Sequence, residues 1–254
     1  MDPQFPDCSH GKVPIGAGAV KNKMRIEPPL LAGLSVVIPT LDAASGLGET
    51  IAALGQAPAE ILVADGGSTD GTPALARSLG ATVIEGPRGR GPQLAAGVRE
   101  AAGPWLLLLH ADTRLAEGWA QEVAPRLADP TRACFFRFAL DDDAVAARRL
   151  ERAVAWRCRF LALPYGDQGL LVHRDLLDAV GGIRPLPLME DVDLVRRIGR
   201  KRLVALESAA VTSAERWRRE GYVIRSGRNL ACLSLWFLGV QPARIAQLYA
   251  GRRG

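Results

Sequence analysis

Long apolar runs are missing from this sequence. The longest one near the C-terminus, residues 230–240, is about half of the roughly 20 residues that a membrane-spanning helix needs, and Ser234 interrupts it. The first residues lack the apolar core of a secretion signal and are rich in Gly and Pro. We therefore expect no transmembrane helix and no secretion, and we predict that residues 1–33 form a disordered leader.

Closely spaced cysteines are missing as well. Cys8, Cys134, Cys158 and Cys232 lie far apart and form no Cys-x-x-Cys pair. This spacing argues against a disulfide framework and against a structural zinc site. With 254 residues, of which 48% are hydrophobic, the chain can build a packed core. These features favour a globular protein of the cytoplasm.

Charge is unevenly distributed along the chain. The net charge is +5, but residues 196–254 carry 13 Lys and Arg against 3 Asp and Glu, and the rest of the chain is net negative. A basic tail of this kind suits nucleic acid, an anionic membrane surface or the phosphates of a small ligand. A solvated arginine-rich face is the alternative.

Strand and helix patterns alternate through the first half. Short β-branched or leucine-rich runs predict strands at residues 34–40, 60–65, 81–86 and 105–110. Helical spacing predicts a helix in each interval, and the third helix runs from Pro92 to Gly103. Such alternation is typical of an α/β fold with a Rossmann-like, mostly parallel sheet flanked by helices.

The pattern is looser in the second half. It predicts strands at residues 134–140, 169–175 and 202–207, and helices at residues 117–127, 144–160 and 189–200. The last forty residues are expected to be largely helical. We predict one main domain over residues 34–212 and a basic helical C-terminal extension, residues 213–254, packed on it.

Polar residues follow each of the first four predicted strands. The first strand ends at Pro39, Thr40 and Asp42, the second at Asp65, the third in a glycine-rich loop with Arg88 and Arg90, and the fourth at His110 and Asp112. Ligands of open parallel sheets bind beyond these strand ends. The set suits a nucleotide diphosphate with a divalent cation. Asp70, in contrast, is expected to be a turn or capping residue.

Four motifs carry a family resemblance. "VVIPTLD", "ILVADGGSTDGT", "GRGPQLAAGVREAAGPWLLLLHADT" and "PLMEDVDLVRR" together resemble family 2 of the inverting nucleotide-sugar glycosyltransferases. "HADT", "PYGDQGLLVHRD" and "ERWRREG" resemble a bacterial branch of that family whose acceptors are mostly unassigned. The resemblance implies the GT-A fold, a nucleotide-diphosphate sugar as donor, and Mn²⁺ or Mg²⁺.

The resemblance assigns the donor side residue by residue. Thr40, next to Pro39, and Asp65 match the residues that bind the nucleotide base, and Arg90 falls in the loop that closes near the diphosphate. Gly66 stands where the usual Asp-Asp-Gly-Ser has its second Asp, so the contact of that carboxylate is lost.

The metal motif departs from the family pattern. Asp112 matches the last residue of Asp-x-Asp, but His110 occupies the first place. An imidazole coordinates Mn²⁺, and one carboxylate with diphosphate oxygens and water is an acceptable shell. We therefore expect Asp112 and His110 to bind the metal. In the alternative, His110 caps the strand end through a hydrogen bond.

The remaining motifs concern catalysis and the acceptor. Asp191 in "MEDVDL" matches the general base, with Glu190 as its positioning partner, although acidic residues also stabilise the start of a helix. Asp167 and Gln168, in a glycine-rich turn, and Arg216 and Trp217 are expected acceptor contacts. Ordinary helix packing is the alternative for Trp217.

These assignments predict an inverting glycosyltransferase. The alternatives are a sugar-nucleotide nucleotidyltransferase, which would want a cation after the first strand, and a non-catalytic nucleotide-sugar binder. The basic tail with Trp236, Phe237 and Leu238 is expected to dock peripherally on the inner face of a membrane and to present a lipid-like acceptor. A soluble acceptor is the other option, and no nucleic-acid partner is expected.

Overall fold

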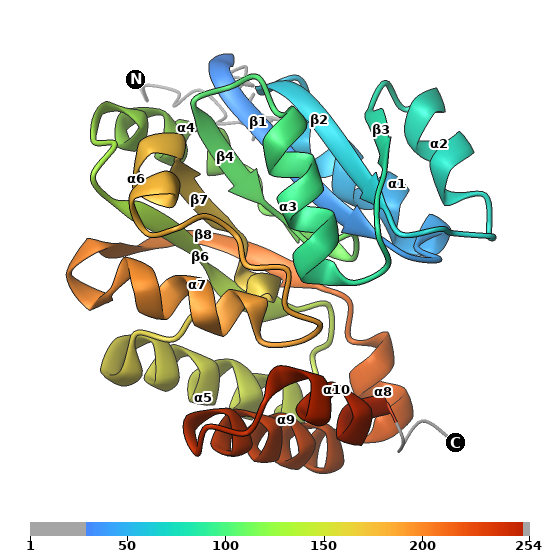
Figure 1. Cartoon of the computed structure of the whole chain (residues 1–254), viewed down its shortest axis with the longest axis vertical. Helices are drawn as coiled ribbons and strands as arrows, with labels where there is room; N and C mark the ends of the chain where they lie inside the picture. Colours follow the sequence, from blue (N-terminus) through green and yellow to red (C-terminus); the bar gives the residue numbers. More distant parts are fainter. Residues whose placement is uncertain (1–28, 251–254) are drawn as a thin grey trace, which may run out of the picture.

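The centre of the molecule is an eight-stranded sheet with the strand order β3-β2-β1-β4-β7-β6-β8-β5 (Figure 1). A computed structural model describes residues 29–250 of the chain. Most of the predicted leader therefore lies outside the described residues. The first strand begins at Leu31, three residues before the predicted start of the main domain.

The first half of the sheet is parallel. It consists of β1 (Leu31–Thr40), β2 (Pro58–Asp65), β3 (Thr82–Glu85) and β4 (Trp105–Leu108). β1 pairs in parallel with β2 and β4, and β2 pairs in parallel with β3. All four predicted strands are thus present, and their carboxyl ends meet at one edge.

The second half of the sheet is mixed. β7 (Leu170–His173) runs antiparallel to β4 and to β6 (Ala133–Leu140), and β8 (Leu203–Thr212) runs parallel to β6. A three-residue strand, β5 (Thr113–Leu115), closes the order by pairing with β8. The sequence did not indicate β5 because three residues carry no readable period.

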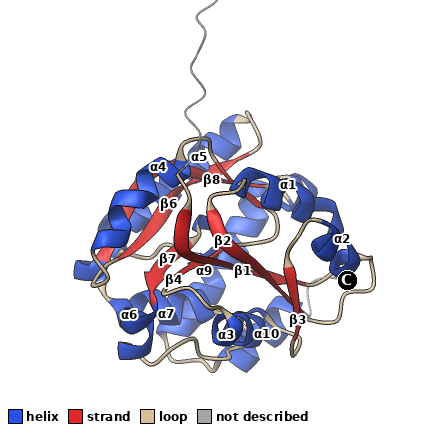
Figure 2. Ribbon diagram, turned by 90° about the horizontal axis from the view of Figure 1, so that it is seen from above, coloured by secondary structure: helices blue, strands red, loops and turns tan. Residues whose placement is uncertain are grey.

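Helices cover both faces of the sheet (Figure 2). One face carries α1 (Ala44–Leu54), α2 (Thr72–Ser78) and α4 (Trp119–Val123), which the 3₁₀ turn η1 (Ala124–Ala128) extends. The other carries α3 (Arg90–Glu100), α6 (Arg174–Ala179) and α7 (Glu190–Ile198). The strand predicted at residues 169–175 is therefore too long, because α6 begins at Arg174.

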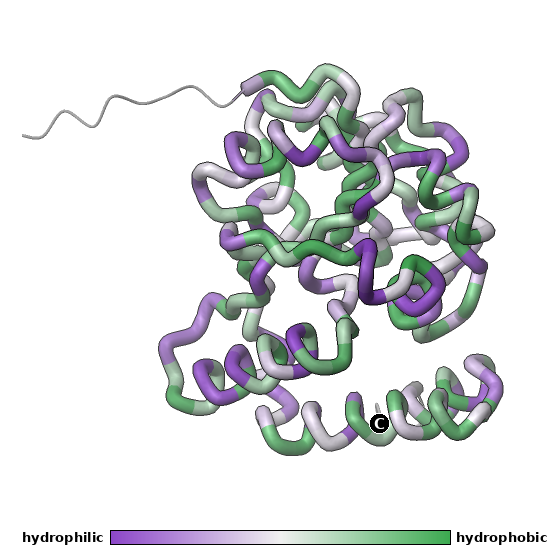
Figure 3. The backbone as a smooth tube through the Cα atoms, turned by 90° about the vertical axis from the view of Figure 1, so that its left-hand side faces the viewer, coloured by the Kyte–Doolittle hydropathy of each residue, from purple (hydrophilic) through white to green (hydrophobic). Residues whose placement is uncertain are grey.

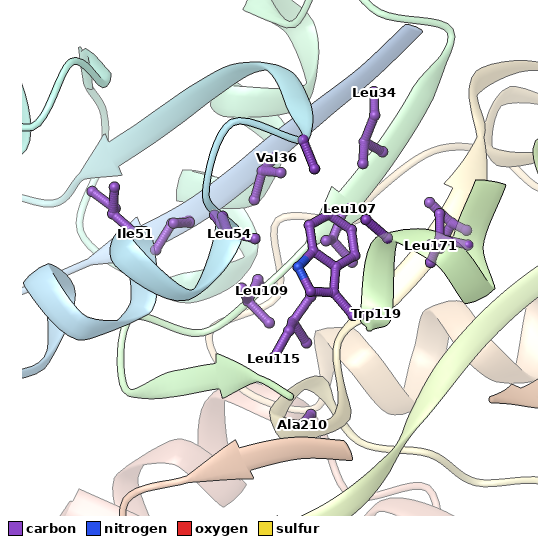
Figure 4. Close-up of a cluster of buried hydrophobic side chains, with 14 of the residues drawn as sticks. Leu34, Val36, Ile51, Leu54, Leu107, Leu109, Leu115, Trp119, Leu171 and Ala210 are labelled. Atoms are coloured by element: carbon purple, nitrogen blue, oxygen red, sulfur yellow. The ribbon is translucent and has the colours of Figure 1, made fainter. Parts of the chain in front are cut away.

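The strands are buried on both faces, as the apolar runs predict. Leu34, Val36 and Ile38 of β1 belong to the core cluster under α1 and α4, whereas Val37 points into the cluster under α3 and α7. Figure 4 shows the first cluster, in which the indole of Trp119 lies among side chains of the sheet and of α1. Full burial stabilises each such side chain by about 1.5–3 kcal/mol.

Helix α3 lies unusually close to β1. A Cβ atom on Gly97 would come within 2.4 Å of Cγ1 of Val37, so only glycine permits this approach. This close approach holds α3 against the sheet, where Gln93 of the helix reaches the ends of β1 and β2.

The C-terminal helices pack on the second half of the sheet. They are α8 (Glu215–Glu220), α9 (Tyr222–Phe237) and α10 (Pro242–Ala250), and they lie below the sheet with α5 (Val145–Leu161) in Figure 1. Trp217 of α8 shares a core cluster with Val154 of α5, and Leu233 of α9 belongs to the cluster of α7. Two further 3₁₀ turns, η2 (Gly166–Gln168) and η3 (Arg200–Arg202), complete the described chain.

Residues 29–250 contain no helix that is both long and apolar enough to cross a lipid bilayer. Cys134, Cys158 and Cys232 form no disulfide bond within the described part of the chain, and Cys8 lies outside it. Burial raises the pKa of the Cys134 thiol to about 11, which makes it a structural rather than a reactive cysteine.

Candidate active site

Asp65 organises the loop that follows β2. Its carboxylate accepts hydrogen bonds from Oγ1 of Thr40 (2.9 Å), Oγ of Ser68 (2.5 Å), N of Gly67 (3.0 Å) and N of Ser68 (2.8 Å). Burial raises the pKa of Asp65, but the hydrogen bonds from Ser68, Thr40 and Gly67 outweigh it and leave the pKa below its ordinary value. Asp65 is therefore ionised and holds a preformed turn beside Thr40.

The loops after β1 and β2 are joined to each other. Asp42, which has a left-handed backbone with φ 48°, accepts from N of Thr69 at 2.8 Å and donates its own N–H to Oγ of Ser68 at 2.9 Å. Asp70 accepts from N of Ala44 at 2.9 Å, at the start of α1, and from N of Thr72 at 3.0 Å. Asp70 therefore forms the turn before α2, as expected, although the N-cap residue of that helix is Gly71.

Gln93 is a site residue that the motifs did not indicate. It is 3% exposed, and its Nε2 donates to the carbonyl oxygens of Thr40 (2.5 Å) and Ala64 (2.8 Å). A Cβ on Gly66 would lie 3.0 Å from this Nε2, so Gln93 covers the position where the family has its second Asp. The available signal was a polar residue on the buried face of α3.

Arg90 lies among the candidate catalytic carboxylates. Its Nε is 3.0 Å from Oε1 of Glu190 and its Nη2 is 4.0 Å from Oδ2 of Asp191. The same Nη2 donates to Nε2 of His110. We expected Arg90 near the base and diphosphate of the donor; in this structure its guanidinium is bound to the first turn of α7 instead.

His110 is neutral and serves as an acceptor. Because an arginine side chain only donates, Nε2 of His110 must carry the lone pair. Burial and the nearby charges of Arg90 and Arg216 hold the pKa of His110 well below its ordinary value. His110 makes a hydrogen bond beyond the strand end, and coordination of a metal through Nε2 would require Arg90 to move.

Gly166 of η2 covers the group formed by Arg90, His110 and Asp191. Its N–H donates to Oδ2 of Asp191 at 2.8 Å. A Cβ at this position would lie 2.6 Å from Nε2 of His110 and 2.9 Å from Nη2 of Arg90. A side chain at this position would displace His110, Arg90 or the turn itself, a constraint that local turn chemistry does not reveal.

Asp167 faces the same group from η2. Its Oδ1 is buried without a hydrogen-bond partner among the described residues. Burial raises the pKa of Asp167 to about 6; Arg157 and Arg90 oppose the increase, whereas Asp191 and Asp112 add to it. Asp167 is thus a poorly satisfied carboxyl directed toward the other acidic residues.

Glu190 and Asp191 differ in exposure. The Glu190 side chain is 3% exposed, and burial raises its pKa against the opposing charge of Arg90. The Asp191 side chain is 19% exposed and lines a small, mostly apolar pocket. Asp191 is the carboxylate that a ligand can reach.

Met189, the residue before Glu190, has a left-handed backbone with φ 68°. This strained conformation is often found at functional sites.

Asp112 is an open carboxylate at the end of β4. Its side chain is half-buried and makes no hydrogen bond or ion pair within residues 29–250, whereas its backbone oxygen accepts from N of Ser213 at 3.0 Å. No group of three or more His, Cys, Asp or Glu side chains in that part of the chain is placed to hold a metal. Asp112 therefore fits a divalent cation only if other ligands, such as diphosphate oxygens and water, complete the shell.

Two expected acceptor contacts do not fit their surroundings. Gln168 is 2% exposed, donates to the carbonyl of Phe136 at 3.0 Å and accepts from Arg157 at 3.2 Å. Trp217 is 7% exposed and stacks on Tyr222 with ring centroids 5.9 Å apart. Burial gives both residues a packing role. Arg216 is exposed, and its charge acts on His110.

Several solved structures have a fold similar to that of this chain. Mannosyltransferase PcManGT from Pyrobaculum calidifontis, solved with GDP-Man and Mn²⁺, is 21% identical with a TM-score of 0.57; the match covers 87% of this chain and 65% of that one. S. aureus TarS 1-349 is 16% identical, with a TM-score of 0.56 and coverage of 71% and 60%. Mannosyl-3-phosphoglycerate synthase from Rubrobacter xylanophilus is 19% identical, with a TM-score of 0.54 and coverage of 82% and 75%.

These similarities confirm the predicted GT-A type of fold. The chain spans less than two thirds of the length of PcManGT and of the TarS fragment. No curated protein matches the chain by sequence. The family model for glycosyl transferase family 2 matches residues 35–186, more than half of the chain. The chain therefore belongs to glycosyl transferase family 2.

Proposed function

We propose that this protein is an inverting glycosyltransferase that moves a sugar from a nucleotide-diphosphate sugar to a hydroxyl acceptor, with Asp191 as general base. The observation that carries the proposal is the convergence of Arg90, His110, Asp112 and Asp191 at the carboxyl edge of the sheet, beside a pocket. Ligands of open α/β sheets bind at this edge.

The donor half of the proposal uses the preformed turn after β2. Asp65 and Thr40 are already bound to each other, and the loops are joined through Asp42, so little ordering is left for the ligand to provide. Pro39 is buried directly before Thr40. A preorganised site of this kind suits recognition of a nucleoside, since it reduces the entropic cost of binding.

The base assignment rests on geometry and charge. Asp191 is partly exposed at the pocket, and Oδ2 keeps a free lone pair beyond its hydrogen bond from Gly166. As the acceptor oxygen attacks the anomeric carbon and the bond to the diphosphate breaks, Asp191 takes the hydroxyl proton. Glu190, held by Arg90, keeps the first turn of α7 in place.

We propose Mn²⁺ or Mg²⁺ as the cofactor, held by Asp112 together with donor phosphates. A bound cation would neutralise charge on the departing diphosphate. His110 becomes a second ligand only if Arg90 releases it. Arg90 then turns to the diphosphate, the position that the family pattern suggests for it.

The acceptor side is proposed at Asp167 and Arg216. Asp167 has an unsatisfied oxygen that a sugar or acceptor hydroxyl would satisfy, and Arg216 is exposed next to His110. A lipid-like acceptor presented at a membrane and a soluble acceptor both satisfy this geometry. The assignment of the chain to a bacterial branch of the family stays a prediction.

Product analysis tests the proposed reaction. The full chain is incubated with a panel of UDP-, GDP- and dTDP-sugars and Mn²⁺, and we expect release of a nucleoside diphosphate from one donor. Formation of a nucleoside triphosphate and a sugar 1-phosphate from the same donors when pyrophosphate is added would favour the nucleotidyltransferase alternative. Donor binding by calorimetry without turnover would favour a non-catalytic binder, and neither binding nor release would reject the proposal.

The base is tested by Asp191→Asn. General-base loss should lower turnover by about 10²–10⁴-fold while donor binding, measured by calorimetry, is retained. Asp175→Asn is the matched control, because that carboxylate is 86% exposed on α6, away from the site. Full activity of Asp191→Asn would rule out Asp191 as the base.

A further inference from the structure

The outward face of α9 carries no charge. Every exposed residue of this helix is apolar or small, and Val223, Leu230 and Phe237 recur at seven-residue spacing with Gly227 and Ser234 between them. Val223 is 86% and Leu230 63% exposed. A surface helix of a globular protein normally turns polar residues outward, so this face is built to meet another apolar phase.

The arginines of α9 do not lie on that face. Arg225 is 3.0 Å from Glu220, and Arg228 contacts the other oxygen of the same carboxylate. The side chains of Arg225 and Arg228 are 12% and 13% exposed. The helix therefore has an inner charged face and an outer apolar face. In Figure 3, the helices around the C-terminus at the bottom of the molecule carry green, apolar stretches.

The C-terminal half of α5 adds aromatic and basic side chains. Trp156 is 57% and Phe160 51% exposed, with ring centroids 5.4 Å apart. Arg152 and Arg159 are exposed on the same half of the helix, and Arg159 lies 5.5 Å from the Phe160 ring. Aromatic rings interleaved with arginines are typical of helices at a membrane–water interface.

The turn from α7 into η3 joins these two helices. Arg200 donates to the carbonyl oxygens of Arg159 (2.9 Å) and Phe160 (3.0 Å) at the end of α5. Arg196 lies 4.8 Å from the Phe237 ring at the end of α9. In Figure 1 the C-terminal ends of α5, α7 and α9 lie on the same side of the molecule. We call the exposed residues of α5 after residue 151, of this turn and of α9 the basic apolar face.

Charge identifies what this face meets. Residues 152–166, 194–206 and 221–254 contain no Asp or Glu, whereas Arg196, Arg200, Lys201 and Arg202 are exposed in the turn. A second copy of the chain would bring two such arginine groups together, which is unfavourable. Anionic lipid headgroups attract each basic side chain, and the apolar side chains enter the headgroup boundary.

We propose that the basic apolar face binds the surface of an anionic lipid bilayer, with the apolar side chains of α5 and α9 at the headgroup boundary and the arginines of the α7–η3 turn on lipid phosphates. The sequence predicted three membrane-contacting residues in the tail. Two of them, Phe237 and Leu238, are exposed on this face, whereas the third, Trp236, packs against the core. α5, which the tail prediction did not include, supplies the other helix of this surface.

The face lies close to the site along the chain. Four residues separate exposed Leu161 from Gly166, which donates to Asp191. A bound bilayer would thus hold the α5–η2 segment, and with it the catalytic centre, near lipid headgroups. This consequence for the acceptor rests on the proposed function; bilayer binding itself does not.

Vesicle sedimentation with the full chain tests the proposal. We expect binding to vesicles of phosphatidylcholine with phosphatidylglycerol, weaker binding at high salt, and little binding to phosphatidylcholine alone. Arg196→Gln with Lys201→Gln should weaken binding by about tenfold, and Leu230→Glu should abolish it. Leu79→Ala is the control, because this leucine is 40% exposed on α2, outside the basic apolar face.

Three results would overturn the proposal: no vesicle binding, equal binding to neutral and anionic vesicles, or a dimer in light scattering that Leu230→Glu dissociates. Circular dichroism of each variant establishes that it folds. Calorimetry with UDP and GDP on the same preparations separates the two proposals. Nucleotide binding without vesicle binding rejects only the proposed membrane-binding face. Vesicle binding without nucleotide binding rejects only the proposed donor site.

Discussion

Two aspartates at the residue scale show how surroundings decide protonation. Asp65 is the last residue of β2 and Asp167 lies in η2, yet the pKa of Asp65 is lowered and that of Asp167 is raised to about 6. Burial raises both, but Asp65 receives hydrogen bonds from Ser68, Thr40 and Gly67, whereas Oδ1 of Asp167 has no partner in the described chain. The hydrogen bonds that a buried carboxyl receives therefore decide the direction in which its pKa shifts.

Asp167→Asn should therefore stabilise the protein, and more so at higher pH. A carboxyl whose pKa is raised on folding contributes stability below its ordinary pKa of 3.8 and loses it as pH rises through about 6. The gain from the substitution should be on the order of 1 kcal/mol larger at about pH 7.5 than at about pH 5. Urea unfolding of both proteins at the two pH values measures it.

His110 does not affect this difference between the wild type and Asp167→Asn. Its lowered pKa costs stability as pH falls below about 6.5, and the cost is the same in both proteins. An identical difference in unfolding free energy at the two pH values would contradict a raised pKa at Asp167.

At the scale of elements, the η2 turn is the contact between the two halves of the site. It connects α5 to β7, and its first residue, Gly166, touches side chains from α3, the end of β4 and α7. Arg157 of α5 supports the turn from behind by lying over the Tyr165 ring at 3.4 Å. A small turn thus couples four elements.

Gly166→Ala should displace η2 from Asp191. The added Cβ would lie 2.6 Å from His110 and 2.9 Å from Arg90, so the turn or those side chains must move. We expect turnover to fall by about tenfold or more while nucleotide binding is kept, because catalysis depends on the position of the base. Steady-state kinetics and calorimetry measure the two effects.

Gly48→Ala in α1 is the matched control, since no atom lies within 4 Å of the added Cβ. Wild-type turnover of Gly166→Ala would mean that η2 does not position the catalytic group.

For the molecule as a whole, the C-terminal helices share a core with the main domain. Removing residues 221–254 would uncover Trp217 and take away Leu233 and the Tyr222–Asp142 hydrogen bond of 2.8 Å. We expect a truncated chain to lose several kcal/mol of stability, about 1.5–3 kcal/mol for each large side chain uncovered. Thermal unfolding followed by circular dichroism measures the loss.

Leu248→Ala serves as the comparison, because this side chain is 58% exposed and its removal should change the unfolding free energy by no more than about 0.5 kcal/mol. An unchanged melting temperature after truncation would mean that residues 221–254 form an independent unit.

Much of the fold was predictable from short-range patterns. The four parallel strands, the crossover helices and α5 follow from apolar runs and helical spacing, and the structure has them within a few residues. β5, the antiparallel direction of β7 and the early start of α6 were not predictable, because they depend on pairing between segments far apart in the sequence.

The candidate site also contains residues that the sequence predicted and residues that it did not. Asp65 and Asp112 were predicted as residues that follow strands, and Glu190 and Asp191 from the family resemblance; the roles of all four stay predictions. Gln93 and Gly166 were missed, and Gln168 and Trp217 were assigned contacts that their burial does not allow, since neither exposure nor close approach is written in local sequence.

By itself, the sequence determined the alternating α/β pattern, the placement of polar groups at strand ends and the family, because each depends on residue types and spacing along the chain. Only the tertiary structure decided that Arg90 holds His110 and Glu190, that Gly166 covers Asp191, and that α5 and α9 form one apolar face. The physical reason is that contact, burial and electrostatic environment arise when distant segments pack, and these set which polar groups remain free to act.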